Sequence, residues 1–179
     1  MKVGNELSKA FPVPSGVPQG GCASPMLYSI FVLEINKYLP ESVKYLEYAD
    51  DLKLYCDTDS ADSRINLQLA VDGIARWCNE NNMILSAQKC VVVTNGATPC
   101  DYSIDGILLP TENVVRDLGV FVSADLDFNY HIAQTVKSAL LLVNTNFRCF
   151  VLKEPDVYIR LYKSLVISKL LYCSPVACP

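Results

Sequence analysis

Residues 43–56, VKYLEYADDLKLYC, decide the fold. Tyrosine and leucine alternate with charged residues on both sides of Ala49, Asp50 and Asp51, and that central composition is typical of a tight turn. The pattern predicts a β-hairpin that turns at the paired aspartates. Because side chains along a strand alternate between its two faces, two adjacent carboxylates can approach one site only in the turn itself.

Asp50 and Asp51 together are a candidate cation site. Two like charges about 4 Å apart repel by about 4 kcal/mol at an effective dielectric near 20. A fold that holds them together therefore needs a cation or raised pKa values. Mg²⁺ suits such a pair, because proteins hold it through one or two carboxylates plus substrate phosphates. For the pair taken by itself, an ordinary solvated Asp-Asp turn is the alternative.

The sequence around this hairpin predicts a loop and two helices. Residues 12–21, PVPSGVPQGG, contain three prolines and three glycines and predict a loop. A helix is predicted over residues 25–39, with Ser24 as its N-cap and Pro40 beyond its end. A second helix is predicted to begin at Asp59 or Ser60 and to end near residue 79. Its predicted buried residues are Ile65, Leu69, Ile74, Trp77 and Cys78.

The remaining sequence predicts short strands followed by two helices. Strands are predicted over residues 90–94, 102–109 and 114–122, with turns at Asn95-Gly96 and Asp105-Gly106. The apolar spacing becomes helical from Tyr130, and a second helix is predicted to start near Pro155. The predicted buried residues of these helices are Ile132, Val136, Ala139, Leu140, Val143 and Phe147 on the first, and Val157, Leu161, Leu165, Ile167 and Leu171 on the second.

The predicted fold class is α+β. An antiparallel sheet covered by helices is expected over residues 1–122, and a helical pair over residues 123–179. A chain of 179 residues suffices for one core, or for one core with a small helical addition. With 51% hydrophobic and 19% charged residues, the composition excludes a disordered chain. No apolar run approaches the roughly 20 residues that cross a bilayer, so no membrane partner is expected.

Charge is distributed unevenly along the chain. The net charge is −4, yet residues 129–179 carry six basic and two acidic side chains, which leaves −8 for residues 1–128. An acidic body with a basic tail fits a cation site beside a segment that binds phosphates. Plain solvated surface charge is the alternative.

The eight cysteines do not show the paired spacing of a structural zinc site. Residues 1–20, broken by Pro12, Pro14 and Pro18, do not resemble a signal peptide. We therefore expect reduced, mostly buried thiols in an intracellular protein, nuclear or cytoplasmic and not secreted. His131, the only histidine, stands at a predicted helix start and is expected at the surface.

Several motifs in order along the chain carry a resemblance to a known family. Tyr48-Ala49-Asp50-Asp51, preceded by Ser15-Gly16-Val17-Pro18-Gln19-Gly20, resembles the reverse transcriptases of non-LTR (LINE-type) retrotransposons. The further matches are Trp77 with Asn81, Leu85, Lys89 and Cys90, then Arg116-Asp117-Leu118-Gly119-Val120, then Leu171-Tyr172-Cys173-Ser174. The resemblance covers nearly the whole chain, and the ordered set is more specific than any of its parts.

The resemblance implies the C-terminal half of a right-hand polymerase palm over residues 1–122, followed by a helical thumb over residues 123–179. It also implies nucleotidyl transfer by RNA-directed DNA polymerase chemistry with two Mg²⁺ ions, or Mn²⁺ in their place. Asp50 would be the principal metal ligand and catalytic residue, with Asp51 second. Lys89 matches a lysine that protonates pyrophosphate or steadies the triphosphate, and a solvated lysine at a strand start is its alternative.

The resemblance assigns further residues to an RNA template, a DNA primer and deoxynucleoside triphosphates. Pro18, Gln19, Gly20, Tyr48 and Ala49 would contact the template and the incoming nucleotide. The primer end would lie against a hairpin that includes Asp117, Leu118 and Gly119. The thumb residues expected on duplex phosphates are Lys137, Arg148, Arg160 and Lys163.

Two departures from the family pattern qualify these expectations. Gly20 is followed by Gly21 and Cys22, where the family usually continues with serine. Residues 1–11 contain no strand with the family's first catalytic aspartate, so metal binding by Asp50 and Asp51 alone and polymerase activity of this chain alone are expected to be weak. The N-terminal part of a polymerase is therefore an expected partner. A non-catalytic nucleic-acid-binding fragment and a decayed mobile-element remnant are the alternative functions.

Overall fold

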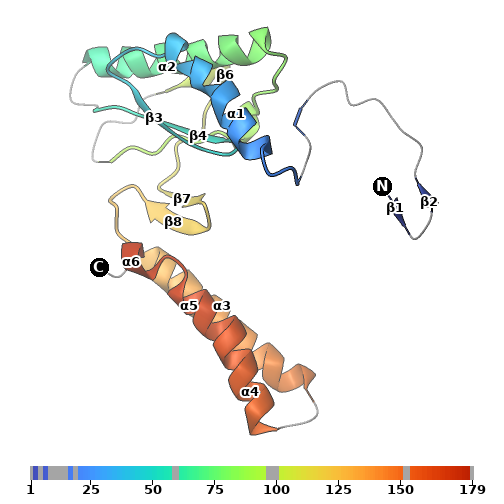
Figure 1. Cartoon of the computed structure of the whole chain (residues 1–179). Coiled ribbons are helices and arrows are strands. Elements are labelled where there is room, and N and C mark those ends of the chain that lie inside the picture. The colour runs from blue at the N-terminus through green and yellow to red at the C-terminus, as the bar shows by residue number, and fades with distance from the viewer. Residues whose placement is uncertain are drawn as a thin grey trace. The chain divides into compact units, whose positions relative to one another are not determined.

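The computed structural model describes residues 2–3, 6–7, 16–17, 20–57, 61–95, 101–150 and 154–177. It divides into two compact units, Met1–Leu85 and Ser86–Pro179. Both units combine helices with small antiparallel sheets of two strands (Figure 1). The predicted mixture of helices and antiparallel strands is confirmed, while the palm and thumb assignment and a boundary near residue 122 stay predictions.

The first unit is built from two helical segments and a hairpin. Helix α1, Ser24–Val32, continues into the 3-10 helix η1, Leu33–Tyr38, and helix α2 spans Ala61–Glu80. A further pair of two-residue strands, β1 Lys2–Val3 and β2 Glu6–Leu7, is antiparallel. The N-cap of α1 is Ala23 without a side-chain hydrogen bond, so the prediction of Ser24 as N-cap is wrong. Both proposed N-caps of α2, Asp59 and Ser60, lie outside the described residues.

The core of the first unit lies between α2 and the α1–η1 segment. Trp77 is 2% exposed, and its ring centroid is 5.3 Å from that of Phe31. Gly73 allows the two segments to approach closely, because a Cβ at this position would lie 2.3 Å from the Tyr38 carbonyl oxygen. The buried residues of the core are Val32, Ile35, Ile74, Trp77 and Cys78. The prediction that Ile65 and Leu69 are buried is wrong, since both side chains are exposed.

The predicted hairpin is confirmed. Strand β3, Lys44–Tyr48, pairs with β4, Asp51–Tyr55, in a register that joins Tyr48 to Asp51 and Lys44 to Tyr55. Leu52 and Leu54 pack against the helical core, and α1 and α2 lie on one side of the hairpin (Figure 1). A two-stranded hairpin is marginally stable by itself in water, so this packing holds it in place.

The second unit begins with short elements. They are η2 Ala87–Lys89, β5 Ser103–Ile104, β6 Ile107–Leu108, β7 Val114–Asp117 and β8 Val120–Ser123. The β5–β6 pair turns at Asp105 and Gly106 as predicted, and β7 pairs with β8. The strand expected over residues 90–94 is wrong, because Val92 forms only one isolated parallel bridge, to Thr111. Gly96, in the predicted turn after it, lies outside the described residues.

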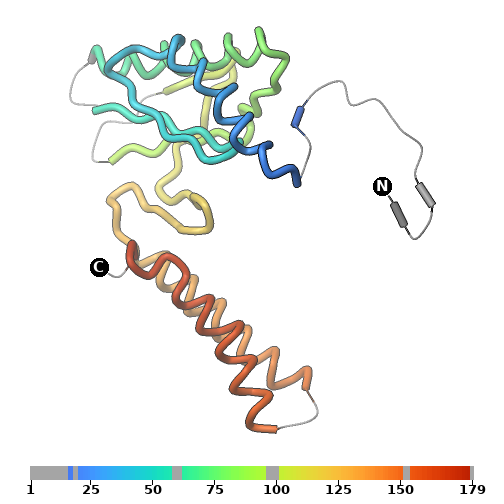
Figure 2. Tube along the Cα trace, in the orientation of Figure 1, coloured from blue at the N-terminus to red at the C-terminus, as the bar shows by residue number. Residues whose placement is uncertain are grey.

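The second unit ends in two helical segments. The first is α3, Asn129–Cys149, and the second comprises α4 Pro155–Leu161, the π-helix η3 Tyr162–Ile167 and α5 Ser168–Leu171, followed by α6 Ser174–Ala177. The segments run side by side in opposite directions (Figure 2). Both predicted helices are confirmed, but of their predicted buried residues only Ala139 is buried. The exposed ones are Ile132, Val136, Leu140 and Phe147 on α3, and Val157, Leu165 and Leu171 on the second segment. Two helices bury one narrow seam, whereas the apolar stripe on each is wider.

The described cysteines are free thiols, as expected, but the expectation that they are mostly buried is wrong. Among the cysteines that the structure describes, only Cys78 is buried, and Cys22 and Cys149 are exposed. Burial raises the pKa of the Cys78 thiol. None of the described helices is both long and apolar enough to cross a bilayer.

Candidate active site

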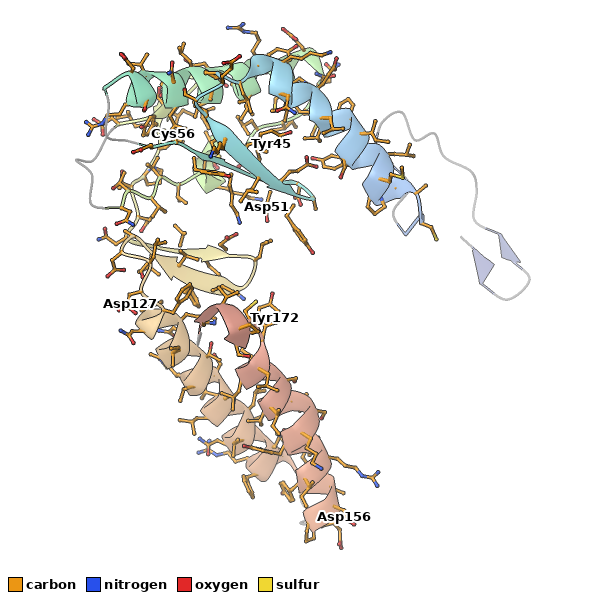
Figure 3. The ribbon with its side chains drawn as sticks, turned by 60° about the vertical axis from the view of Figure 1, so that its left-hand side comes forward. Tyr45, Asp51, Cys56, Asp127, Asp156 and Tyr172 are labelled. Atoms are coloured by element: carbon orange, nitrogen blue, oxygen red, sulfur yellow. The ribbon has the colours of Figure 1, made fainter. Side chains whose placement is uncertain are left out.

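The adjacent carboxylates lie at the tip of the β3–β4 hairpin. Ala49 and Asp50 form the turn, while Asp51 is the first residue of β4 and pairs with Tyr48 (Figure 3). Ala49 has a φ of +53°, in the left-handed region that costs an L-residue about 1–2 kcal/mol. Tyr48, Asp50 and Asp51 are all exposed, so the hairpin presents the carboxylates to solvent.

The two faces of the hairpin differ in what they contact. Cross-strand partners share a face, so Leu52, which packs on the helical core, places its partner Glu47 on the helical side. The next pair, Tyr48 with Asp51, therefore lies on the opposite face. Only Asp50 of the two aspartates is in the turn, where backbone direction changes and the alternation of faces does not constrain it.

Asp50 acts electrostatically on helix α1. The pKa of the Tyr28 hydroxyl is raised above its ordinary value, first by burial and then by the negative charges of Glu47 and Asp50, with a further contribution from Cys78. Tyr28 packs against the helical core. The field of Asp50 therefore reaches the helical side of the hairpin, whereas Asp51 belongs to the outer face.

The hairpin tip suits a divalent cation held partly by substrate. Carboxylate oxygens are hard ligands, and both are open to solvent, as Mg²⁺ requires when phosphates complete its octahedral shell. Within the ranges that the structure describes, no group of three or more His, Cys, Asp or Glu residues could hold a metal ion by itself. The described residues therefore offer two exposed carboxylates at one hairpin tip, and a cation bound there would take its remaining ligands from substrate.

The other predicted substrate contacts are described in part. Gly20 is exposed with a φ of +80°, which glycine adopts without strain, and it precedes α1 by a short turn. Pro18 and Gln19 lie outside the described residues. Lys89 is the last residue of η2 in the second unit, with an exposed side chain. Its predicted role in protonating pyrophosphate stays a prediction.

The segment predicted to hold the primer end is a hairpin. Asp117 pairs with Val120, and Leu118 and Gly119 form the two-residue turn between them. Leu118 is exposed, whereas Asp117 and Gly119 are half-buried. The structure thus brings the three predicted residues together at one hairpin end.

The predicted cationic residues are distributed over both helical segments of the second unit. Lys137 and Arg148 belong to α3, Arg160 to α4 and Lys163 to η3, and all four side chains are exposed. Lys137 and Arg148 are 11 residues apart, close to three helical turns, so they share one side of α3. Exposed cations on one side of a helix can contact successive phosphates of a duplex.

Two residues that hold the β7–β8 hairpin were missed as functional candidates. The Tyr172 hydroxyl donates a hydrogen bond to the Leu118 carbonyl oxygen over 2.7 Å. His131 is 5% exposed, so the expectation of a surface histidine is wrong. Its Nδ1 accepts a hydrogen bond from the Phe121 backbone N–H over 3.3 Å. The sequence offered a signal for Tyr172, which lies in a family-like motif, and none for His131.

These features define a class only coarsely: a segment of helices and small antiparallel sheets with an exposed acidic turn at the tip of one hairpin. The family model described as reverse transcriptase (RNA-dependent DNA polymerase) matches residues 1–127. The chain belongs to the reverse transcriptase family, whose members generally use divalent metal ions.

Three curated relatives agree with this assignment. The chain is 30% identical over 132 residues to the RNA-directed DNA polymerase from mobile element jockey of Drosophila melanogaster, an alignment that covers 68% of this chain and 14% of the relative. The RNA-directed DNA polymerase from mobile element jockey of Drosophila funebris is 28% identical over 180 residues, an alignment that covers 92% of this chain and 19% of that relative. The probable RNA-directed DNA polymerase from transposon BS of Drosophila melanogaster is 26% identical over 149 residues, and this alignment covers 76% of this chain and 16% of that relative.

These relatives confirm the resemblance to reverse transcriptases of non-LTR retrotransposons. The chain spans less than a fifth of the length of each relative. No solved structure matches the chain.

Proposed function

We propose that this chain is the segment of an RNA-directed DNA polymerase that carries the paired catalytic aspartates, the primer-end hairpin and part of the thumb. The observation that carries the proposal is the Tyr48-Ala49-Asp50-Asp51 turn, exposed at the tip of a hairpin whose leucines Leu52 and Leu54 pack against a helical core. Family membership supports it, since the matched region includes both hairpins. Its substrates would be an RNA template, a DNA primer and deoxynucleoside triphosphates.

Asp50 would be the principal ligand of Mg²⁺, with Asp51 second. When bound, divalent ions stabilise the charge that develops on the attacking 3′ oxygen and on the departing pyrophosphate. Asp50 suits the role of principal ligand because it lies in the turn, where the alternation of side chains between strand faces does not fix its direction. Asp51 lies in β4, and that alternation directs it to the outer face. Tyr48 and Ala49 would contact the nucleotide from the same turn, as would Pro18, Gln19 and Gly20 from the glycine-rich loop.

The second unit would hold nucleic acid. The turn at Leu118 and Gly119 would bear on the primer end, where the absence of a side chain at Gly119 permits close approach of backbone. Lys137, Arg148, Arg160 and Lys163 would contact duplex phosphates. Lys89 would steady or protonate the leaving pyrophosphate, consistent with its exposed side chain.

The metal assignment is tested by Mn²⁺ binding to the 179-residue chain with primer–template and deoxynucleoside triphosphate present, with free Mn²⁺ measured by electron paramagnetic resonance. We expect Asp50→Asn to weaken binding by about tenfold, equivalent to 1.4 kcal/mol, and Asp51→Asn to weaken it less. Glu41→Gln is the matched control, because Glu41 is an exposed carboxylate outside the turn. Equal Mn²⁺ affinity of Asp50→Asn and wild type would contradict the assignment.

A parallel measurement distinguishes catalysis from simple binding. Duplex affinity is measured for the same variants without divalent ions. If every variant binds duplex with wild-type affinity and none loses Mn²⁺, the chain is a nucleic-acid-binding segment without a metal site. Loss of Mn²⁺ in Asp50→Asn together with intact duplex binding supports the polymerase role.

A further inference from the structure

The turn of the β7–β8 hairpin has a backbone that its sequence disfavours. Leu118 has a φ of +45° and Gly119 a φ of +90°, and positive values at both central positions are the pattern of a type I′ turn. Such turns favour asparagine or aspartate at the first position and glycine at the second. A leucine there costs about 1–2 kcal/mol. The turn is therefore held by something beyond its own residues.

Tyr172 supplies one such contact. It directly follows α5, and its hydroxyl donates to the Leu118 carbonyl oxygen over 2.7 Å (Figure 3). Its ring lies against the next residue, because a Cβ at Gly119 would be 3.2 Å from Tyr172 Cε1. A single side chain thus fixes the carbonyl of the strained residue and occupies the space above the glycine. Both contacts lie within the second unit.

His131 supplies a second contact, from α3. Asp117 and Val120 are the hydrogen-bonded pair that closes the turn. In an antiparallel ladder such pairs alternate with pairs that exchange no hydrogen bonds, and Arg116 with Phe121 is the next pair. The Phe121 N–H therefore points away from β7, to the outer edge of β8. That N–H donates to His131 Nδ1 over 3.3 Å. The buried imidazole of α3 therefore lies against the outer edge of β8.

The Phe121 ring strengthens the same junction. It meets the Tyr130 ring edge-on at a centroid distance of 5.3 Å, and the Arg116 guanidinium carbon lies 5.9 Å from its centroid. Aromatic pairs of this geometry contribute about 0.5–1.5 kcal/mol beyond area burial. Strand β8 is thereby attached to the first turn of α3, and the turn of the hairpin to the residue after α5.

We propose that Tyr172 and His131 are positioning residues that set the Leu118–Gly119 turn in the conformation that receives the primer end. The inference rests on the proposed function, because the proposed function assigns this turn to the primer end. The inference adds what sets the conformation of the turn. The two side chains come from the two helical segments that carry the predicted phosphate contacts. Through them, the position of those segments and the shape of the hairpin end are mechanically linked.

The contact is tested in the full 179-residue chain with Tyr172→Phe, which removes the hydroxyl and keeps the ring. We expect amide hydrogen exchange of residues 114–123 to rise about fivefold, the effect of losing one ordinary hydrogen bond. The thermal midpoint should change little. Tyr162→Phe is the matched control, an exposed tyrosine in η3 of the same unit. Unchanged exchange in Tyr172→Phe would overturn the positioning role.

A second pair of variants tests the ring contact without relying on the hydroxyl. Gly119→Ala should increase amide exchange of the hairpin more in wild type than in a Tyr172→Ala background. In wild type the new Cβ collides with the Tyr172 ring, and in the Tyr172→Ala background that ring is absent. The strain of a positive φ remains in both backgrounds. Equal effects of Gly119→Ala in the two backgrounds would show that the ring does not constrain the turn.

Primer–template affinity separates this inference from the proposed function. If the wild-type chain binds no primer–template, the proposed function fails. If wild type binds and Tyr172→Phe binds equally well despite faster hairpin exchange, the primer-positioning role fails and the proposed function stands. We expect Tyr172→Phe to raise the Kd several-fold for a recessed primer end, and to leave affinity for an internal duplex site unchanged.

Discussion

At the scale of single residues, Tyr28 reports on the charge at the hairpin tip. Its side chain packs partly buried against the helical core, and its raised pKa includes contributions from Glu47 and Asp50. An ionised tyrosine is destabilised by nearby negative charge, so any change that neutralises those carboxylates should make it ionise more readily. Tyr28 is therefore a reporter for occupancy of the candidate cation site.

We predict that the single variants Asp50→Asn and Glu47→Gln each lower the pKa of Tyr28. The decrease should be larger in Glu47→Gln, because Glu47 contributes more to the raised pKa than Asp50 does. Burial, the largest cause, remains, so the pKa should stay above its ordinary value in both variants. The measurement is a pH titration of the Tyr28 ring carbon by NMR, with Glu41→Gln as control. A reversed order of the two variants would show that Asp50 lies closer to Tyr28 than Glu47 does.

Sequence patterns could predict the acidic turn, but not its backbone or its surroundings. Alternation around Ala49 marks a hairpin, yet nothing in an alanine indicates a φ of +53°. The same limit applies to His131, whose burial depends on a strand edge that no helical pattern describes. Local patterns record which residues are apolar and at what spacing, whereas these features depend on the backbone geometry of a turn and on how one element packs against the next.

At the scale of elements, the packing of α2 on η1 depends on one glycine. Gly73 lies in the middle of a helix, where glycine costs about 1 kcal/mol relative to alanine. The close approach of the Tyr38 carbonyl explains its presence. An isolated glycine in a helical pattern is a sequence signal of such close packing.

We predict that Gly73→Ala destabilises the chain by about 1–3 kcal/mol, because overpacking against backbone outweighs the gain in helix propensity. Denaturant unfolding of the full chain measures this change. Asn79→Ala is the matched control, since Asn79 is exposed on the same helix. A Gly73→Ala variant that is more stable than wild type would mean that α2 and η1 separate without cost.

Apolar periodicity located the helices correctly and their buried faces less well. In α2, Ile74, Trp77 and Cys78 are buried as predicted, while Ile65 and Leu69 are exposed. Periodicity identifies the apolar stripe of a helix. How much of that stripe is buried depends on how far the element packed against it extends along the helix. The exposed members of the stripe lie in the first half of α2, and the core residues lie in the second half.

At the scale of the whole molecule, charge separates the two ends of the sequence. The basic residues of 129–179 give that region a charge of +4, against −8 for the remainder. Each phosphate that a protein neutralises contributes about −0.9 to the slope of log affinity against log salt for duplex DNA. The number of phosphate contacts can therefore be measured without a structure of a complex.

We predict that replacing Lys137 and Arg148 by glutamine lowers duplex affinity and makes the salt slope shallower by about 1.8, the value for two lost phosphate contacts. Affinity is measured by fluorescence anisotropy across a range of salt concentrations. Lys37→Gln is the control, because Lys37 is paired with Glu34 at 2.7 Å in the first unit. A slope unchanged by the double substitution would remove these residues from the duplex contact.

The hydrogen bond from Tyr172 to Leu118 also constrains the order in which the second unit matures. The two residues are 54 positions apart, so their contact closes a long loop that contains both helical segments. At a synthesis rate of about 5–20 residues per second, the turn leaves the ribosome roughly 3–11 seconds before Tyr172 does. During that interval Leu118 has no Tyr172 hydroxyl to hold its carbonyl, and the hairpin can sample other turns. Its final conformation is thus acquired late, when the returning helix reaches it.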